Sequence, residues 1–215
     1  MRIAVFGAAG NVGSRVVAEA LARGHEITAV VRDPARFPAL HPGAAHRVGD
    51  AADSGDVAAL SEGHDLVISA TRPAPGNEEG LVLAARGLLA GLATTGVRLL
   101  LVGGAGSLTV PGTGGRVRVG DDTRYVPAEW RPIARACDAQ YALLLRQATA
   151  LEWTYASPPA LLAPGARTGH YRLGTDELLV DETGRSALST EDFAVALLDE
   201  AERPQHHRAR FTVAY

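Results

Sequence analysis

Three glycines near the start of the chain have a spacing that suits the binding of a phosphate group. They stand at Gly7, Gly10 and Gly13 in the segment GAAGNVG, between an apolar run and a stretch with helical periodicity. In such a loop the first glycine permits a tight turn, the second lets the backbone approach a pyrophosphate, and the third permits close packing of helix on strand. The N-terminus of the helix that follows offers free N–H groups and the positive end of its dipole. This context predicts a nucleotide site.

The end of the second predicted strand indicates which dinucleotide fits. Folds that bind NAD usually place an acid about 20 residues after the glycine loop, but Arg32 stands there, followed by Asp33. Arg15 lies just inside the first predicted helix, and two guanidinium groups near one point can hold a 2′-phosphate in a bidentate way. We therefore expect NADP (as NADPH) in preference to NAD. Two interpretations of Asp33 remain open: it caps the next turn, or it binds a ribose hydroxyl.

Few side chains are placed to assist a reaction. Ser107 comes shortly after a predicted strand, and Tyr125 lies in a glycine-rich segment at residues 103–127 that should shape the pocket. We take Ser107 and Tyr125 as candidate catalytic residues; the alternatives are a turn hydroxyl bonded to local backbone and a surface aromatic. Two roles remain open for Trp130: it stacks on a flat substrate, or it packs against the rest of the fold. The seven histidines are scattered, so we predict no metal site.

The elements that must position these residues alternate along the chain. Short apolar runs and helical stretches follow one another, as in a parallel sheet covered by helices on both faces. We predict an α/β fold with a doubly wound parallel sheet, a Rossmann fold, in one domain over residues 1–215 with a small C-terminal lobe on the same sheet. Strands are predicted at residues 3–6, 26–31, 45–48, 65–70, 98–102, 153–156 and 208–213, with short ones near Tyr171 and at 178–180. Helices are predicted at residues 11–23, 57–61, 78–94, 128–148 and 190–202.

Length and composition restrict the class of protein. The chain has 215 residues, of which 47% are hydrophobic and 21% charged, and a net charge of −3. Such a chain can bury a core, and it lacks the basic excess of a dedicated nucleic-acid binder. The lone Cys137 excludes an internal disulfide, and no uncharged apolar run reaches the roughly 18–20 residues of a membrane span. We expect a soluble, cytoplasmic monomer or homodimer whose partner is a small molecule.

Several motifs together resemble the atypical short-chain dehydrogenase/reductase superfamily. They are the glycine loop, Val-Arg-Asp-Pro at residues 31–34, Gly-Asp-Ala-Ala-Asp at 49–53, Gly-Gly-Ala-Gly-Ser-Leu at 103–108 and the closing segment at 210–215. The resemblance is strongest for the small NAD(P)H-binding branch, which includes NADH-flavin reductases, NmrA-like proteins and biliverdin-IXβ/flavin reductase. It runs over the whole chain.

The resemblance implies a row of residues along a bound dinucleotide. They are Gly7, Gly10, Asn11 and Val12 at the pyrophosphate, Arg32 at the adenosine phosphate, Asp50 and Ala51 at the adenine edge, Ala70 and Thr71 along the ribose path, Gly103, Gly104 and Ala105 under the nicotinamide, and Ser157, Pro158 and Pro159 at the nicotinamide side.

The chain departs from the wider superfamily in its chemistry. Typical members use Tyr-x-x-x-Lys, in which an ammonium group lowers the pKa of the tyrosine, but all 21 cations here are arginine. Tyr141 is followed four residues later by Leu145, and its place on an apolar helix face predicts a core residue. Carbonyl–alcohol dehydrogenation is therefore disfavoured. Hydride transfer to a flavin- or quinone-like acceptor is favoured, because such an acceptor delocalises charge and takes a proton from water.

Three functions remain open at this stage. The leading hypothesis is an NADPH-dependent reductase of a small, flat, electron-poor acceptor. The second is a nucleotide-sensing regulatory protein without turnover, since NmrA-like relatives keep the dinucleotide site and lose catalysis. The third is an isomerase, epimerase or biosynthetic tailoring enzyme that uses the cofactor differently.

Overall fold

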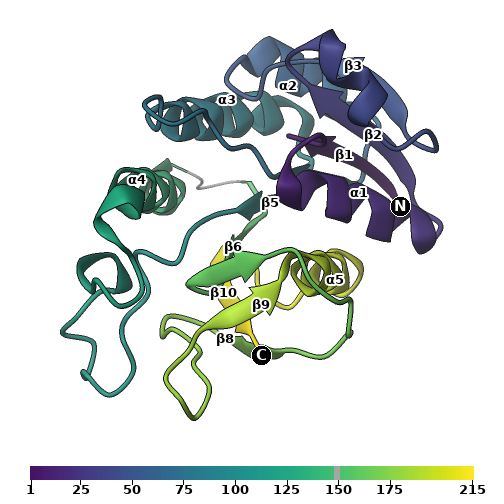
Figure 1. Cartoon of the computed structure of the whole chain (residues 1–215). Helices are drawn as coiled ribbons and strands as arrows, with labels where there is room; N and C mark the ends of the chain where they lie inside the picture. The colour runs from purple at the N-terminus through teal and green to yellow at the C-terminus, as the bar shows by residue number, and fades with distance from the viewer. Residues whose placement is uncertain (148–150) are drawn as a thin grey trace.

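The computed structural model describes residues 1–147 and 151–215 and alternates strands with helices (Figure 1). The strands are β1 (Arg2–Phe6), β2 (Glu26–Val31), β3 (Ala45–Val48), β4 (Leu66–Ser69), β5 (Arg98–Val102), β6 (Trp153–Ser157), β7 (Leu161–Ala163), β8 (Arg172–Gly174), β9 (Ala187–Ser189) and β10 (Ala209–Ala214). The α-helices are α1 (Asn11–Ala22), α2 (Ser54–Ser61), α3 (Gly80–Thr95), α4 (Arg131–Gln147) and α5 (Thr190–Glu202). Short 3₁₀ helices are η1 (Pro34–Ala39), η2 (Val119–Asp121) and η3 (Ala128–Trp130).

Eight strands form a sheet in the order β3-β2-β1-β4-β5-β6-β10-β8. Neighbours pair in parallel, except that β8 runs antiparallel to β10. The strand order reverses between β1 and β4, as in a Rossmann fold. The predicted doubly wound α/β fold is thus confirmed. β7 and β9 pair in parallel in a separate two-stranded sheet.

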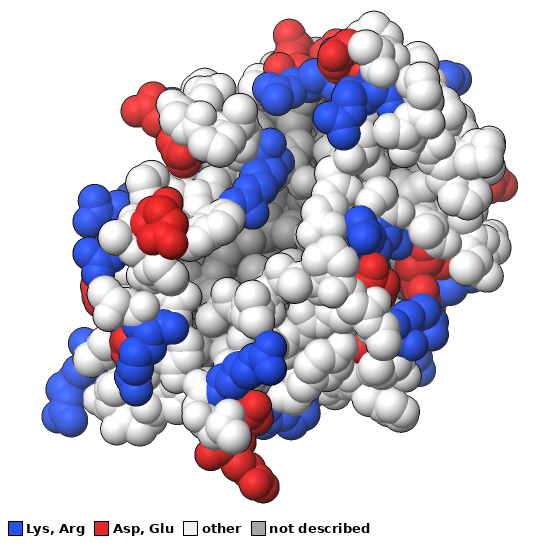
Figure 2. All heavy atoms as spheres, viewed as in Figure 1, with Lys and Arg blue, Asp and Glu red and all other residues white. Residues whose placement is uncertain are grey.

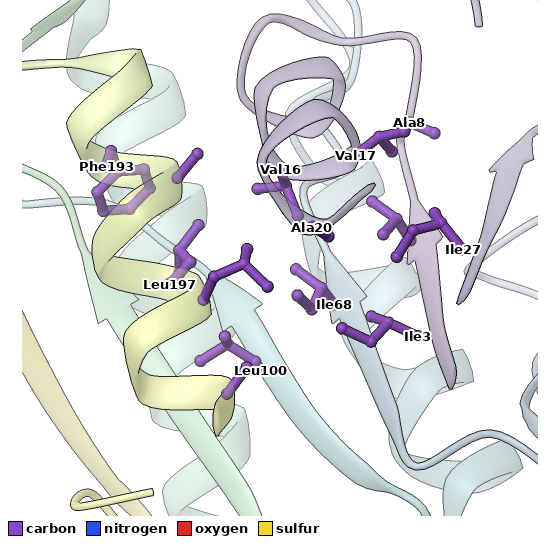
Figure 3. Close-up of a cluster of buried hydrophobic side chains, with 14 of the residues drawn as sticks. Ile3, Ala8, Val16, Val17, Ala20, Ile27, Ile68, Leu100, Phe193 and Leu197 are labelled. Carbon is purple, nitrogen blue, oxygen red and sulfur yellow. The ribbon is translucent and has the colours of Figure 1, made fainter. Parts of the chain in front are cut away.

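Alternate residues of the central strands serve two separate hydrophobic cores. Ile3 and Val5 of β1 pack in a cluster with α1 and α5, and Figure 3 shows Ala20 of α1 and Leu197 of α5 in that cluster. Ala4 and Phe6 pack on the opposite face of the sheet, with α2, α3 and α4. Because both faces are covered, the carboxyl ends of the strands remain as the edge at which a ligand can reach the sheet.

The C-terminal part differs from the prediction in two places. Residues 178–180 form no strand: the N–H of Leu178 donates to the carbonyl of Thr109 (2.9 Å), and the Leu178 side chain is buried with Leu108, Val110 and Val119. Leu178 thus joins a small core with the glycine-rich segment instead of extending a ladder. β7 and β9 were not predicted, because three residues each are too few to show a period.

Three helices begin two or three residues away from their predicted starts, and one of them is α3, which begins at Gly80 instead of residue 78. α2 begins at Ser54 because the carboxylate of Asp53 caps it, accepting the N–H groups of Gly55 (2.8 Å) and Asp56 (3.0 Å). The helix predicted over residues 128–148 begins as η3 and continues as α4 from Arg131. Its predicted last residue, Ala148, lies outside the described residues. Among the helices that the structure describes, none is long and apolar enough to cross a membrane.

Candidate functional site

A pocket of about 1280 Å³ extends along the carboxyl-terminal edge of the parallel sheet. Figure 2 shows a hollow on this face of the molecule with arginine side chains at its rim. Residues that follow six strands line the pocket: Gly7 and residues 9–12 after β1, Arg32 and Asp33 after β2, residues 49–52 after β3, 70–73 after β4, 103–106 after β5 and 158–162 after β6. The pocket crosses the reversal point between β1 and β4, where open α/β sheets bind ligands. Its volume exceeds the roughly 300–1,000 Å³ of a usual small-molecule pocket.

The glycine loop takes its shape from contacts that a side chain would prevent. Gly7 has a φ of +79°, in the left-handed region, and a Cβ there would lie 2.6 Å from the carbonyl oxygen of Ala70. A Cβ on Gly13 would lie 2.1 Å from the carbonyl oxygen of Gly7, so α1 packs directly on the end of β1. The N–H of Gly10 donates to the same oxygen (2.9 Å) and closes the turn.

The N-terminus of α1 opens toward the pocket. Gly10 occupies the N-cap position, and no side chain of the described residues caps this end by a hydrogen bond, whereas Asp53 caps α2 and Ser189 caps α5. Asn11 and Val12, in the first turn, line the pocket. Because the first N–H groups of a helix have no intrahelical acceptor, this end presents donors and a positive dipole to an anion.

Two arginines line the pocket at the end of β2: Arg32, which was predicted, and Arg36, which was not. Arg32 is exposed and lines the pocket as expected. Arg15 does not line it: its Nε donates to Glu191 of α5 (3.1 Å), because this face of α1 packs against α5. Arg36 stands in its place, with Nη2 donating to the carbonyl of Ala9 in the glycine loop (3.1 Å).

Asp33 caps the turn that carries Arg36, the first of its two interpretations. Its Oδ1 accepts the N–H of Ala35 (2.8 Å) at the start of η1, and Pro34 occupies the first position of this helix. An Asp-Pro pair after a strand was the sequence signal that the chain turns here and brings Arg36 back to the glycine loop.

Most of the remaining predicted cofactor residues line the same pocket. They are Asp50, Ala51, Ala70, Thr71, Gly103, Gly104, Ala105, Pro158 and Pro159. A Cβ on Gly104 would lie 2.7 Å from the Cβ of Cys137, so the backbone after β5 lies against α4. Ser157 is the exception: it is fully buried, its Oγ has no hydrogen-bond partner among the described residues, and it does not line the pocket.

The two candidate catalytic residues lie in different surroundings. Ser107 is outside the pocket, because the chain turns away after Gly106; its Oγ accepts from Nη1 of Arg210 (2.8 Å), which also pairs with Asp176. Tyr125 lines the pocket, and its Oη donates to the carbonyl of Gly184 (3.1 Å). The structure therefore keeps Tyr125 beside a possible ligand and places Ser107 in a structural network.

The other reactive side chains near the pocket are held in unreactive forms. Tyr141 packs against Tyr155, with ring centroids 4.7 Å apart, and burial raises its pKa. Tyr155 is fully buried, its Oη donates to the Cys137 carbonyl (2.9 Å), and burial raises its pKa as well. Cys137 lines the pocket, and burial raises the pKa of its thiol to about 12. None of these groups suits general-base or nucleophilic work near neutral pH.

Sequence reasoning missed the lining residues that come from distant segments. Among them are Arg36, Arg72, Arg124, Cys137, Leu161, Leu162 and residues 183–186. Arg72 had a local signal, since it directly follows the predicted Thr71. Residues 161–162 and 183–186 had none, because only the β7–β9 pairing brings them together.

Comparison with known proteins supports a nucleotide-binding role. A model of an NAD(P)H-binding family matches residues 7–204. The uncharacterized protein YwnB of Bacillus subtilis (strain 168) is 36% identical over 215 residues, which cover 99% of this chain and 98% of YwnB.

Two solved structures are similar over the whole chain. A "putative epimerase" from Bacteroides thetaiotaomicron is 38% identical, with a TM-score of 0.88 and coverage of 100% of this chain and 96% of that one. SP1627 of Streptococcus pneumoniae TIGR4, described as "a putative NADH-flavin reductase", is 32% identical, with a TM-score of 0.85 and coverage of 100% and 99%.

Proposed function

The chain belongs to the NAD(P)H-binding family, and from that membership we propose that it is an NADPH-dependent reductase. Its acceptor is a small, flat, electron-poor molecule such as a flavin or a quinone. The similarity to the "putative NADH-flavin reductase" of Streptococcus pneumoniae supports this proposal.

The extent of the pocket is the observation that carries the proposal. The glycine loop, the open end of α1 and residues 103–105 lie along one pocket, in the order that a dinucleotide requires. The same pocket continues to Trp130 and Leu162, beyond the nicotinamide segment. A volume of about 1280 Å³ offers space for a second molecule beside the cofactor.

The preference for NADPH rests on the end of β2. Arg32 and Arg36 both line this part of the pocket, and the Oδ1 of Asp33 is engaged in capping η1. Two guanidinium groups bind a 2′-phosphate well, and the carboxylate of Asp33, which could accept from a 2′-hydroxyl, already has one oxygen in the cap of η1.

The residues of the pocket fit a reaction in which the chain positions two rings. The nicotinamide cofactor supplies hydride chemistry when bound. Gly103 and Gly104 line the pocket with backbone, because a Cβ on either would meet the Tyr155 ring (1.9 Å) or the Cβ of Cys137 (2.7 Å). Pro158 and Trp130 give this part of the pocket an apolar lining. Without a tyrosine–lysine pair, an acceptor that takes its proton from water is the one that this arrangement serves.

The test is the oxidation of NADPH followed at the reduced-nicotinamide absorbance band with flavin and quinone acceptors. The proposal predicts oxidation that requires both the protein and an acceptor. NADPH binding without acceleration by any such acceptor would contradict it and favour the sensing function.

A further inference from the structure

We propose that the acceptor carries an anionic group, a carboxylate or a phosphate, which Arg72 and Arg185 bind. This inference rests on the proposed function and names the substrate class of the same site. It comes from the uneven distribution of charge along the pocket.

Charge is distributed unevenly along the pocket, because the end that holds the acids also holds Arg32 and Arg36, whereas the rest of its described lining holds arginines without acids. Of the described residues that line it, Asp33 and Asp50 are the acids, and both follow strands at the β2–β3 end of the sheet. Arg72, which follows β4, and Arg124 and Arg185, which come from later segments, line the rest of the pocket, where none of the described lining residues is acidic. This excess of positive charge favours a negatively charged ligand and disfavours a cationic one.

Arg124 is neutralised within the protein, whereas the other two cations are not. Its Nε lies 3.0 Å from Oδ1 of Asp122, and its Nη2 donates to the second oxygen of the same carboxylate, Oδ2 (2.5 Å). Arg72 and Arg185 form no ion pair with a carboxylate in the part of the chain that the structure describes. The Asp181 carboxylate interacts electrostatically with Arg185 without forming a salt bridge, so the N–H donors of both guanidinium groups remain available to a ligand.

Stacking holds the guanidinium of Arg72 at the pocket. Its Cζ lies 5.1 Å from the ring centroid of Trp130, a cation–π contact between the segment after β4 and η3. A cation–π contact uses none of the five N–H donors of a guanidinium group. Arg72 can thus bind an anion while Trp130 fixes its position.

A hydrogen-bonded turn brings Arg185 to the pocket. Oδ1 of Asp181 accepts the N–H groups of Thr183 (2.8 Å) and Arg185 (3.0 Å), and the N–H of Gly184 donates to the Asp181 carbonyl (2.9 Å). The hydrogen bond from Tyr125 to Gly184 joins this turn to the opposite wall. The backbone that carries Arg185 is therefore fixed beside the part of the pocket that Tyr125 lines.

A matched pair of flavins tests the inference. FMN and riboflavin have the same ring system and differ in the 5′-phosphate, so their difference reports on the anion. The first measurement is the binding of each to NADP⁺-saturated protein, followed by quenching of flavin fluorescence, which needs no turnover. We expect FMN to bind about tenfold more tightly, the effect of a charge-assisted hydrogen bond. This difference should decrease as salt is added.

Variants assign the effect to the two arginines. Arg185→Gln and Arg72→Gln should each weaken FMN binding by about threefold, since the two share the tenfold effect, and leave riboflavin and NADPH binding unchanged. Arg86→Gln makes the same change of charge at an exposed position of α3 outside the pocket. It should change the affinity for neither FMN nor riboflavin.

Three outcomes would overturn the inference: no binding of FMN, equal binding of FMN and riboflavin, or variants that weaken NADPH binding and both flavins together. The last would assign the arginines to the cofactor. Equal binding accompanied by NADPH oxidation would leave the reductase function standing. Preferential binding of FMN without oxidation would contradict the reductase function alone.

Discussion

At the scale of single residues, the partners of each arginine in the folded chain determine its role, and its distance in sequence from the glycine loop does not. Arg15 and Arg36 both lie near the glycine loop, but Arg15 pairs with Glu191 and Arg36 donates to Ala9. Arg36 thereby joins Arg32 at the end of the pocket where the proposed 2′-phosphate binds.

Replacement of Arg32 by aspartate tests that assignment. We expect Arg32→Asp to weaken NADPH binding by about 30-fold or more and NADH binding by less than about threefold, because the phosphate loses a charge-assisted hydrogen bond and meets a like charge. Titration calorimetry with both cofactors measures this difference. Arg15→Gln, which removes a guanidinium outside the pocket, should leave the ratio of the two affinities unchanged. Equal losses for NADPH and NADH in Arg32→Asp would show that Arg32 does not bind the 2′-phosphate.

At the scale of elements, the turn between β1 and α1 couples the packing of the fold to the binding of the cofactor. Gly13 lets the first turn of α1 approach the carbonyl of Gly7, and the same approach directs the open N-terminus of α1 into the pocket. A change in that packing should therefore affect stability and binding together.

The variant Gly13→Ala tests this coupling. Its Cβ would lie 2.1 Å from the oxygen of Gly7, so α1 must shift, and we expect a loss of about 2 kcal/mol in the free energy of unfolding together with weaker NADPH binding. Urea unfolding and cofactor titration measure the two effects. Gly24→Ala is the control: Gly24 has a φ of +81° and open space around it, so the substitution should cost about 1 kcal/mol and leave NADPH binding intact. Normal NADPH affinity in Gly13→Ala would refute the coupling.

Much of the pocket was predictable because its signals are local. The apolar run that forms β1, the glycine loop and Arg32 follow one another in the sequence, and the fold class orders them at one edge of the sheet. Ser107 and Ser157 were misplaced, because the direction of a side chain after a strand depends on neighbours such as Arg210 that are distant in sequence. Arg185 could not be predicted for the same reason, since the pairing of β9 with β7 brings the residues that precede β9 to the pocket.

At the scale of the whole molecule, an ionic cluster connects α1 with the C-terminal half. Oε2 of Glu19 in α1 accepts from Nε of Arg167 (2.7 Å), and Oε1 accepts from Nε of Arg23 (2.8 Å). Arg23 also donates to Asp199 of α5 (2.8 Å). Hydrogen bonds from Arg167 and Arg23 hold the pKa of Glu19 at about 2, although burial opposes them.

This cluster predicts a loss of stability in acid. A carboxyl whose pKa is lower in the folded state stabilises it above the unfolded pKa of 4.5, and the contribution decreases as the pH falls toward about 2. Since Arg167 is half exposed, we expect Glu19 to contribute about 1–2 kcal/mol near neutral pH. Urea unfolding of the native protein and of Glu19→Gln should show a difference that decreases from pH 6 to about pH 3. A difference that does not change with pH would contradict this assignment.

The most direct test of the central claim is a single turnover of NADPH that carries deuterium at the transferred C4 position. Protein saturated with this NADPH is mixed rapidly with FMN or a quinone, and the decay of the reduced-nicotinamide band is compared with that of unlabelled NADPH. The reductase function predicts a decay that is faster than in the protein-free mixture and slower with deuterium, because the bond to hydrogen breaks in the pocket. A decay equal to that of the protein-free mixture for every acceptor would contradict the account.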